Sequence, residues 1–297
     1  MAHSSSQSDP LANPLANQFA VSSKRKLFGN VMTALVFACV VIAAIPLLSI
    51  LFMVITKGLA GLSPAVFTDL PPAAGVSGGG FRNAIIGTLL TCLIGALVSV
   101  PFGVLTAVYT IEFGRGNRLS QFVSFCTNIL SGVPSIIAGL FAYGVVVLTT
   151  GSFSAVAGGI ALSVLMLPII IRTAEEGFKS IPRDTRLGAV GIGATNFQSV
   201  TQIILPAAMP FIATGVTLAL ARAAGETAPL LFTALFNQYD AKSIWEPTAT
   251  LSVLIYNFAI SPYKNQQALA WVAALIVVCL ILVVSILARI VSRRKVY

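Results

Sequence analysis

The chain has 297 residues, of which 57% are hydrophobic and only 9% are charged. Soluble domains carry roughly one quarter charged residues, so this composition excludes an ordinary soluble protein and indicates a membrane protein. The net charge of +9 requires no nucleic-acid partner, because basic ends attracted to anionic membrane lipid account for it.

Residues 1–26 precede the first apolar run. They are rich in Ser and Asn and contain the tandem sequence PLANPLAN together with the single histidine, His3. Such a composition is typical of disorder, so we predict a disordered N-terminal segment. Residues 27–297 are predicted to form one helical membrane domain.

Six charge-poor runs are long enough to cross a bilayer, which takes about 18 or more apolar residues. They cover residues 31–56, 84–111, 121–150, 153–171, 207–236 and 268–288. The sequence therefore predicts an all-α integral membrane protein with six transmembrane helices. The first run exceeds the about 7 to 15 apolar residues of a cleavable signal peptide, so we interpret it as a retained signal anchor.

The orientation of the spans follows from their flanking Lys and Arg residues. Thirteen lie on one side of the predicted spans: Lys24, Arg25, Lys26, Arg115, Arg118, Arg172, Lys179, Arg183, Arg186, Arg289, Arg293, Arg294 and Lys295. Four lie on the other side: Lys57, Arg82, Lys242 and Lys264. Because short cationic loops stay on the cytoplasmic side, both termini are predicted to be cytoplasmic.

The third run contains the segment NILSGVPSIIAGLF, residues 128–141. Ser131, Gly132, Pro134 and Ser135 are polar or helix-weakening residues in the middle of a predicted span. Two interpretations are open: a broken helix that lines a cavity, or a kink that fits neighbouring helices.

The connection 172–206 is long enough for two short helices. Pro182 suits the start of the first, which would run through Ile192, and Gly193 suits the left-handed residue that ends it. A second helix through Phe197, Val200 and Ile203 or Ile204, ending before Pro206, would carry one apolar face. We expect that face to be exposed and to need a partner.

Nucleotide, metal and cofactor sites are not predicted. The sequence GIGATN lacks the third glycine of a dinucleotide fingerprint, and GFKS lacks the glycine that a phosphate loop needs directly before Lys179. The four cysteines lie inside predicted spans without the paired spacing of a metal site or a disulfide framework.

The connection also resembles the cytoplasmic signature of the permease subunits of ATP-binding-cassette (ABC) importers. That signature is Glu-Ala-Ala, three residues, Gly, nine residues, Ile, any residue and Leu-Pro. Ala189, Gly193, Ile203, Leu205 and Pro206 fall at its positions, whereas Leu187 and Gly188 replace the Glu and the first Ala. The segments GVPSIIAGLF, LPIIIRTAEEGFKSIP, GATNFQSVTQIILPAAMP and ARAAGETAPLLFTA look like the phosphate-specific permeases, of the type with the shorter periplasmic connection after its first span.

This resemblance implies the type I ABC importer permease fold in a bacterial inner membrane. The chain would pair with a second similar permease and translocate inorganic phosphate by alternating access. Two ATPase subunits would dock under a coupling loop at about 175–206 through the signature residues, and a periplasmic phosphate-binding protein would deliver the substrate. ATP hydrolysis would belong to those partners, so the chain itself is expected to be no enzyme.

Arg222 and Glu226 lie four residues apart in the fifth predicted span and hence on one helix face. A charge at the bilayer centre costs at least about 2.5 kcal/mol, so the pair should face protein or water. Arg222 would offer forked donors to phosphate while Glu226 holds it between transport events, or the pair would be a structural brace. Arg172, at the end of a span, is either an interface anchor or a residue of the pathway.

Three alternatives remain at this stage. A secondary transporter would need inverted repeats and several intramembrane carboxylates, whereas Glu226 is the only clear one in the predicted spans. A permease for another oxyanion, such as sulfate or molybdate, has the same sequence features. A membrane scaffold without transport would tolerate Leu in place of Arg222.

Overall fold

The computed structural model describes residues 23–114 and 116–293, which form helices and loops without any β-strand. The predicted all-α class is confirmed for this part of the chain. Residues 1–22, with His3, lie outside it, as do Arg115 and residues 294–297. The contacts divide the chain into two units, Met1–Met53 and Val54–Tyr297, and each is described by itself.

The first unit is described from Ser23 and consists of most of helix α1 (Ser23–Ala60). α1 therefore begins within the segment 1–26, four residues before the expected start of the membrane domain. Its stretch from Arg25 to Ala60 is long and apolar enough to cross a membrane.

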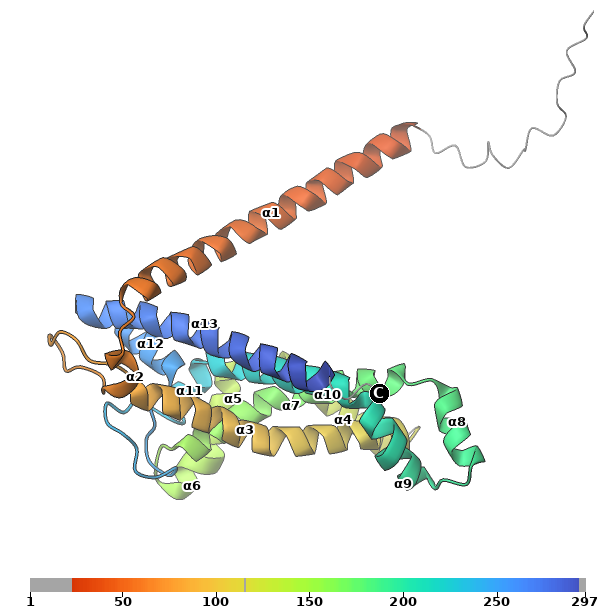
Figure 1. Cartoon of the computed structure of the whole chain (residues 1–297). Helices are drawn as coiled ribbons and strands as arrows, with labels where there is room; N and C mark the ends of the chain where they lie inside the picture. Colours follow the sequence, from red (N-terminus) through yellow and green to blue (C-terminus); the bar gives the residue numbers. More distant parts are fainter. Residues whose placement is uncertain (1–22, 115, 294–297) are drawn as a thin grey trace, which may run out of the picture. The chain divides into compact units, whose positions relative to one another are not determined.

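The second unit contains four more such helices (Figure 1). The first is α3 (Arg82–Val108), which continues into the π-helical turn η1 (Tyr109–Phe113), and the second is α7 (Ala155–Ser180). The third is one continuous helix made of α9 (Asn196–Ser199), the π-helical turn η3 (Val200–Ile204) and α10 (Leu205–Gly225). The fourth is α13 (Lys264–Arg293). A bent pair of helices makes a sixth span when it is counted as one. The six-span pattern predicted from the sequence is thus present, with its third member broken.

The bent pair consists of α4 (Arg118–Gly132) and a run from α5 (Ser135–Ala142) through η2 (Tyr143–Val147) to α6 (Leu148–Thr150), and the two halves meet at 109°. Pro134 begins the second half, with ψ 137°. The proline ring and its missing N–H do not allow the preceding helix to continue. Of the two interpretations of this segment, the broken helix is confirmed.

The fifth span was predicted at 207–236, and both boundaries were wrong. The helix already begins at Asn196 and ends at Gly225. Pro206 does not stop it, because the π-helical turn η3, which ends at Ile204 two residues before Pro206, widens the helix and accommodates the ring. After Gly225 the chain turns into the short helix α11 (Ala228–Leu231), which packs against α5.

The connection 237–267 contains a helix that the sequence analysis missed, α12 (Leu251–Ala259). Its nine residues are too few to cross a membrane. Leu251, Val253, Leu254 and Phe258 are buried, and α12 packs against α13 and α3. It therefore belongs to the core rather than to a loop.

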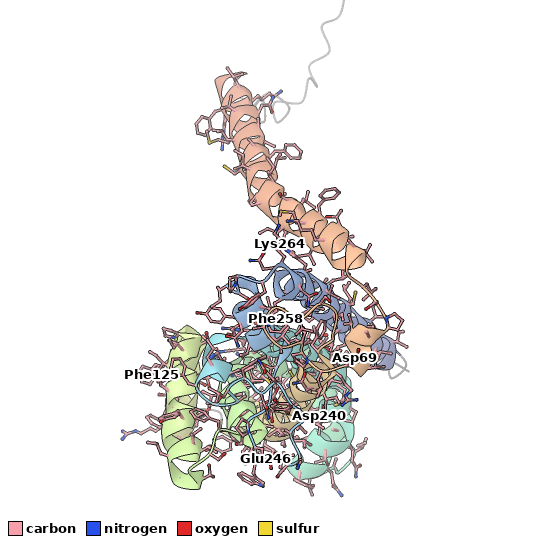
Figure 2. All side chains as sticks on the ribbon, turned by 90° about the vertical axis from the view of Figure 1, so that its left-hand side faces the viewer. Asp69, Phe125, Asp240, Glu246, Phe258 and Lys264 are labelled. Atoms are coloured by element: carbon pink, nitrogen blue, oxygen red, sulfur yellow. The ribbon has the colours of Figure 1, made fainter. Side chains whose placement is uncertain are left out.

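The long helices of the second unit lie side by side, with α7 packed between α3 and α10 (Figure 1). α8 (Arg183–Gly191) and α9 lie at one end of the bundle, and α2 (Ala65–Thr68) lies at the other. Figure 2 looks onto the α2 end and labels its charged residues Asp69, Asp240, Glu246 and Lys264. The connections thus gather at two opposite ends, as expected for a membrane bundle.

Candidate functional site

Arg222 and Glu226 form the expected ion pair, with Arg222 Nε 3.1 Å from Glu226 Oε1. Glu226 is the first residue after α10, and its extended backbone carries a carbonyl that accepts a hydrogen bond from Ser252 of α12 at 2.8 Å. The Glu226 side chain is 16% exposed, whereas that of Arg222 is 49% exposed. In the described part of the chain, the two terminal nitrogens of Arg222 have no partner. Arg222 therefore keeps most of its donors available.

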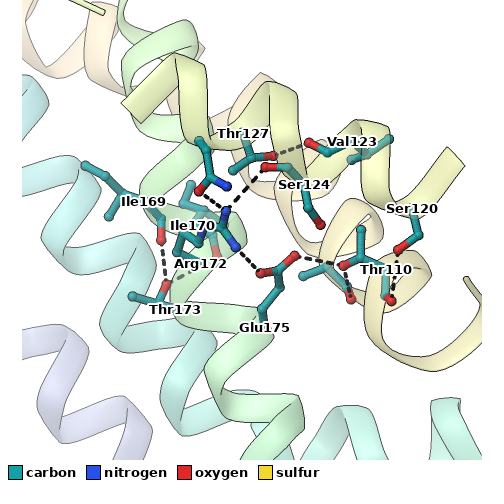
Figure 3. A network of polar contacts seen from close by, with 12 residues as sticks. Thr110, Ser120, Val123, Ser124, Thr127, Ile169, Ile170, Arg172, Thr173 and Glu175 are labelled. Carbon is teal, nitrogen blue, oxygen red and sulfur yellow. Dashed lines mark hydrogen bonds and ion pairs between the residues drawn. The ribbon is translucent and has the colours of Figure 1, made fainter. Parts of the chain in front are cut away.

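Arg172 on α7 is held by three acceptors (Figure 3). Its Nη1 donates to Glu175 Oε2 at 2.8 Å, and its Nη2 donates to the carbonyl of Ser124 at 3.3 Å and to Asn128 Oδ1. Ser124 and Asn128 belong to α4, so the guanidinium connects α7 to the first half of the broken span. The guanidinium therefore has fixed partners on both helices.

Glu175 is the carboxylate at the centre of this network. Only 2% of the residue is exposed, and its Oε1 accepts a hydrogen bond from Thr110 Oγ1 at 2.9 Å (Figure 3). Ser120 in turn donates to the carbonyl of Thr110 at 3.3 Å. Glu175 lies beyond the predicted run 153–171 but within the longer helix Ala155–Ser180, so the structure adds a buried carboxylate that the predicted spans did not include.

Arg172 and Arg222 line one cavity of about 230 Å³. The break in the third span contributes Leu130, Ser131 and Val133 to its wall, and α7 contributes further residues. Water occupies about 30 Å³ per molecule in the liquid, so the space is large enough for a small anion with a few water molecules. The sequence indicated each of these parts separately, and the structure brings them together.

Close packing keeps the two arginine-bearing helices together at this cavity. Gly215 of α10 lies so near Thr173 of α7 that a Cβ atom at position 215 would come within 1.8 Å of Thr173 Oγ1. Thr173 itself lines the cavity. The absence of a side chain at Gly215 thus determines how closely α10 approaches α7 beside the two guanidinium groups.

The arrangement suits reversible binding of an oxyanion. Each arginine has a carboxylate partner, so the paired side chains add little net charge to the cavity. Arg222 can still present its terminal N–H groups in the fork geometry that fits phosphate and carboxylate oxygens. Arg172 has most of its donors occupied by fixed partners, so its guanidinium is held in one place beside the cavity.

The predicted first helix of the connection 172–206 is present as α8, with Pro182 before its first residue. Gly193 has φ +89°, the left-handed conformation that the sequence predicted. Ala189 is buried, and its carbonyl accepts a hydrogen bond from the N–H of Ala194 at 3.1 Å. Thr195 and Gln198 then form a capping box that starts α9. The turn between α8 and α9 is therefore well defined.

The second apolar face differs from the expectation. Val200 and Ile204 are buried against α3 and α7 residues, and only Phe197 stays exposed. Ile203, Leu205 and Pro206 lie on the continuous helix instead of at the end of a short one. The exposed large apolar side chains between the start of α8 and the end of α9 are Leu187, Val190, Ile192 and Phe197. Leu187 and Val190 belong to α8, Ile192 directly follows it and Phe197 lies on α9, so the surface in need of a partner runs from α8 to α9.

Residues 99–297 match the family described as binding-protein-dependent transport system inner membrane component. The chain is 41% identical over 249 residues, 84% of either chain, to the phosphate transport system permease protein PstA of Yersinia pestis. It is 40% identical over 271 residues to PstA of Haemophilus influenzae, covering 91% of this chain and 96% of that one. The chain belongs to the PstA permease family.

A further PstA relative matches at lower identity. The chain is 32% identical over 290 residues, 92% of either chain, to PstA 1 of Mycobacterium tuberculosis strain CDC 1551 / Oshkosh. PstA-family membership makes the chain a permease subunit of a transport system in the inner membrane, and a secondary transporter is not favoured. The resemblance stated from the sequence segments is thereby confirmed.

Solved structures show the same fold for this PstA-family chain. One match is to a bacterial alginate ABC transporter in complex with an alginate pentasaccharide-bound periplasmic protein. Its TM-score is 0.62 at 18% identity, and it covers 89% of this chain and 94% of that one. The MetNI methionine ABC transporter in an inward-facing conformation matches with a TM-score of 0.58 at 22% identity, covering 72% and 94%. The fold class predicted from the sequence is confirmed by these likenesses.

Proposed function

We propose that this chain is one of two similar permease subunits that together import inorganic phosphate through an ABC transporter. Its PstA relatives are named for phosphate transport, and they match most of the chain at 32 to 41% identity. A periplasmic phosphate-binding protein delivers the anion, and two ATPase subunits hydrolyse ATP. The chain itself performs no hydrolysis and uses no cofactor.

One observation carries the assignment of the pathway: Arg172 and Arg222 line the same cavity. Phosphate passing this cavity meets the free donors of Arg222, while Glu226 takes back the guanidinium when the anion leaves. Exchange between two partners avoids the permanent trapping that an unpaired buried arginine would cause. Glu175 and Asn128 keep Arg172 turned toward the cavity wall.

The ATPases dock on the α8 end, where Leu187, Val190, Ile192 and Phe197 are exposed. Exposed apolar groups of this kind mark contact surfaces. Ala189 and Gly193 shape the turn that presents this surface, and Ile203, Leu205 and Pro206 join it rigidly to α10. The coupling loop thus covers about residues 175–206.

The α8 end is proposed to face the cytoplasm, with both termini on that side and the membrane lipid around the spans. Arg183 and Arg186 of α8 and Lys179 at the end of α7 gather there, as the positive-inside rule expects. Residues 1–26 are the cytoplasmic N-terminal segment of the proposed domain organisation, and residues 27–297 are its permease domain.

The experiment is uptake of labelled phosphate into proteoliposomes that contain this chain, its partner permease and its ATPase, with ATP inside and phosphate-loaded binding protein outside. We expect uptake that stops with an ATPase-dead partner. Unlabelled sulfate and molybdate should not compete. Uptake driven by an ion gradient without ATP would overturn the ABC assignment, and the absence of ATP-dependent uptake of labelled phosphate would overturn phosphate as the substrate.

A further inference from the structure

Arg186 on α8 makes four polar contacts with two other elements. Its Nη2 donates to Glu112 Oε1 at 2.7 Å and its Nε to Glu112 Oε2 at 3.3 Å. Nη2 and Nη1 also donate, each at 2.6 Å, to the carbonyls of Phe178 and Ile181. Glu112 belongs to η1 at the end of α3, and the carbonyls belong to the end of α7 and the residue after it. One side chain therefore joins α8 to two spans.

The contact is largely removed from water. The Arg186 and Glu112 side chains are 15% and 7% exposed. A two-pronged guanidinium–carboxylate pair fixes orientation as well as distance, and the carbonyl bonds satisfy further donors. The four contacts make this a rigid connection, unlike a solvated surface ion pair.

α8 has few other attachments to the bundle. Ala189 is its only buried residue, whereas Leu187 and Val190 point to its exposed surface. Leu187 also occupies the position at which the family signature has glutamate. Arg186, directly before it, thus supplies a charged attachment point toward the inside of the molecule.

The connection continues from η1 to the cavity. Two residues before Glu112, Thr110 of the same π-helical turn donates to Glu175, and Glu175 holds Arg172. π-helical turns are uncommon and recur at functional positions. An unbroken series of contacts therefore runs from α8 to the cavity. Arg186 contacts Glu112, the η1 turn joins Glu112 to Thr110, and Thr110 contacts Glu175, which holds Arg172.

We propose that the Arg186–Glu112 pair is the joint that transmits movement of α8 to the cavity arginines, an inference that rests on the proposed function of α8 as the ATPase-docking helix. When the ATPases move α8, Arg186 pulls on η1 and on the end of α7 together. η1 then displaces Thr110 from Glu175, which frees Glu175 to reposition Arg172. Arg186 is a positioning residue in this scheme and does not contact the anion.

Contacts in series do not by themselves establish coupling, so the test measures transmission directly. A chain with its native cysteines replaced by serine carries Ser131→Cys in the cavity wall, and its labelling by a thiol reagent is followed with and without ATP and vanadate. We expect the labelling rate to change with ATP in this background. Arg186→Gln should abolish the change while the complex still assembles and hydrolyses ATP. This readout needs no phosphate, so it stays informative if the transported anion proves to be another one.

Arg183→Gln is the matched control, because Arg183 lies on the same helix, is exposed, and has no ion-pair partner among the described residues. It should keep the ATP-dependent change. Phosphate imported per ATP hydrolysed should fall by about 5- to 150-fold in Arg186→Gln, the usual range of coupling between distant sites, and stay unchanged in Arg183→Gln. Arg186→Lys keeps the charge but not the fork, so it should retain part of the coupling.

A single substitution removes the Arg186 partner of the buried Glu112 carboxylate, which can prevent assembly. The double variant Arg186→Gln with Glu112→Gln removes that charge. We expect it to assemble and to remain uncoupled. Normal ATP-dependent labelling in Arg186→Gln or in the double variant overturns the proposal. Failure of the double variant to assemble also overturns it, because the pair would then be a structural brace.

Discussion

The Arg222 guanidinium contacts the Glu226 carboxylate at 3.1 Å although Glu226 already lies outside α10. The pair therefore connects the last turn of the helix to the loop that follows it, and Ser252 fixes that loop from α12. A carboxylate on a loop can move away from its arginine more easily than one on the helix itself. This geometry fits a partner that releases and retakes Arg222.

The double variant Arg222→Gln with Glu226→Gln separates a pathway charge from a brace. Replacing both members of a buried pair is often nearly neutral for stability, and this pair is half-exposed on the arginine side. We expect the variant to assemble with its ATPase and to lose phosphate uptake. Labelled uptake is measured against an ATPase-dead control. Normal uptake by the assembled variant would contradict the pathway role of Arg222.

Gly193→Val tests the turn after α8. A residue with a β-branched side chain at φ +89° costs about 1–2 kcal/mol or more in backbone strain. No atom lies within 4 Å of a Cβ built at this position, so the effect comes from the backbone alone. We expect weaker co-purification of the ATPase and reduced uptake, with normal membrane insertion. Gly191→Val is the control, since position 191 is equally open and its φ is not positive.

Gly215→Val tests the close approach of α10 to α7. The added side chain collides with Thr173 and must separate the two helices, at a cost of about 1–3 kcal/mol typical of overpacking. We expect a lower thermal midpoint of the purified complex and a loss of uptake greater than the loss of assembled protein. Gly144→Ala adds a methyl group in open space and should change neither quantity. If uptake fell only in proportion to the amount of assembled protein, the spacing of α10 and α7 at the cavity would have no separate role in transport.

Reporter fusions test the orientation of the spans. A reporter that is active only in the cytoplasm should work after Tyr297 and near Arg183, and one that is active only outside should work near Lys242. These positions follow from the cationic bias and from the opposite ends of the bundle that carry α8 and α2. The reverse pattern of activities would be incompatible with cytoplasmic termini.

The sequence predicted the features that depend on short-range rules. Bilayer thickness determines the length of a span, so the apolar runs located the helices. Proline interrupts a helix and glycine allows a positive φ, and the structure shows the helix break at Pro134 and the left-handed backbone at Gly193. Arg222 and Glu226 are four residues apart, so their contact could be predicted from spacing, although Glu226 lies directly after α10 and not on it.

Features that depend on remote parts of the chain could not be predicted in this way. The partners of Glu175 include Thr110, and that of Arg186 is Glu112, both on η1 far earlier in the chain. The spacing of Arg172 and Glu175 was the only local signal of this network. α12 was missed because protein packing, rather than lipid, buries its short apolar stretch. Pro206 misled the prediction because η3 accommodates it within the helix.

The ion pairs beside the cavity have a consequence for biogenesis. Arg172 and Glu175 lie on α7 itself, and Arg222 and Glu226 follow one another at the end of α10. Each segment thus carries its own counter-charge when it leaves the insertion machinery, before any neighbouring helix has arrived. An isolated charge near a helix centre raises the insertion free energy by about 2.5 to 3.5 kcal/mol, and a local partner reduces that penalty. The same carboxylates that hold the arginines in the finished permease therefore help each helix to enter the bilayer singly.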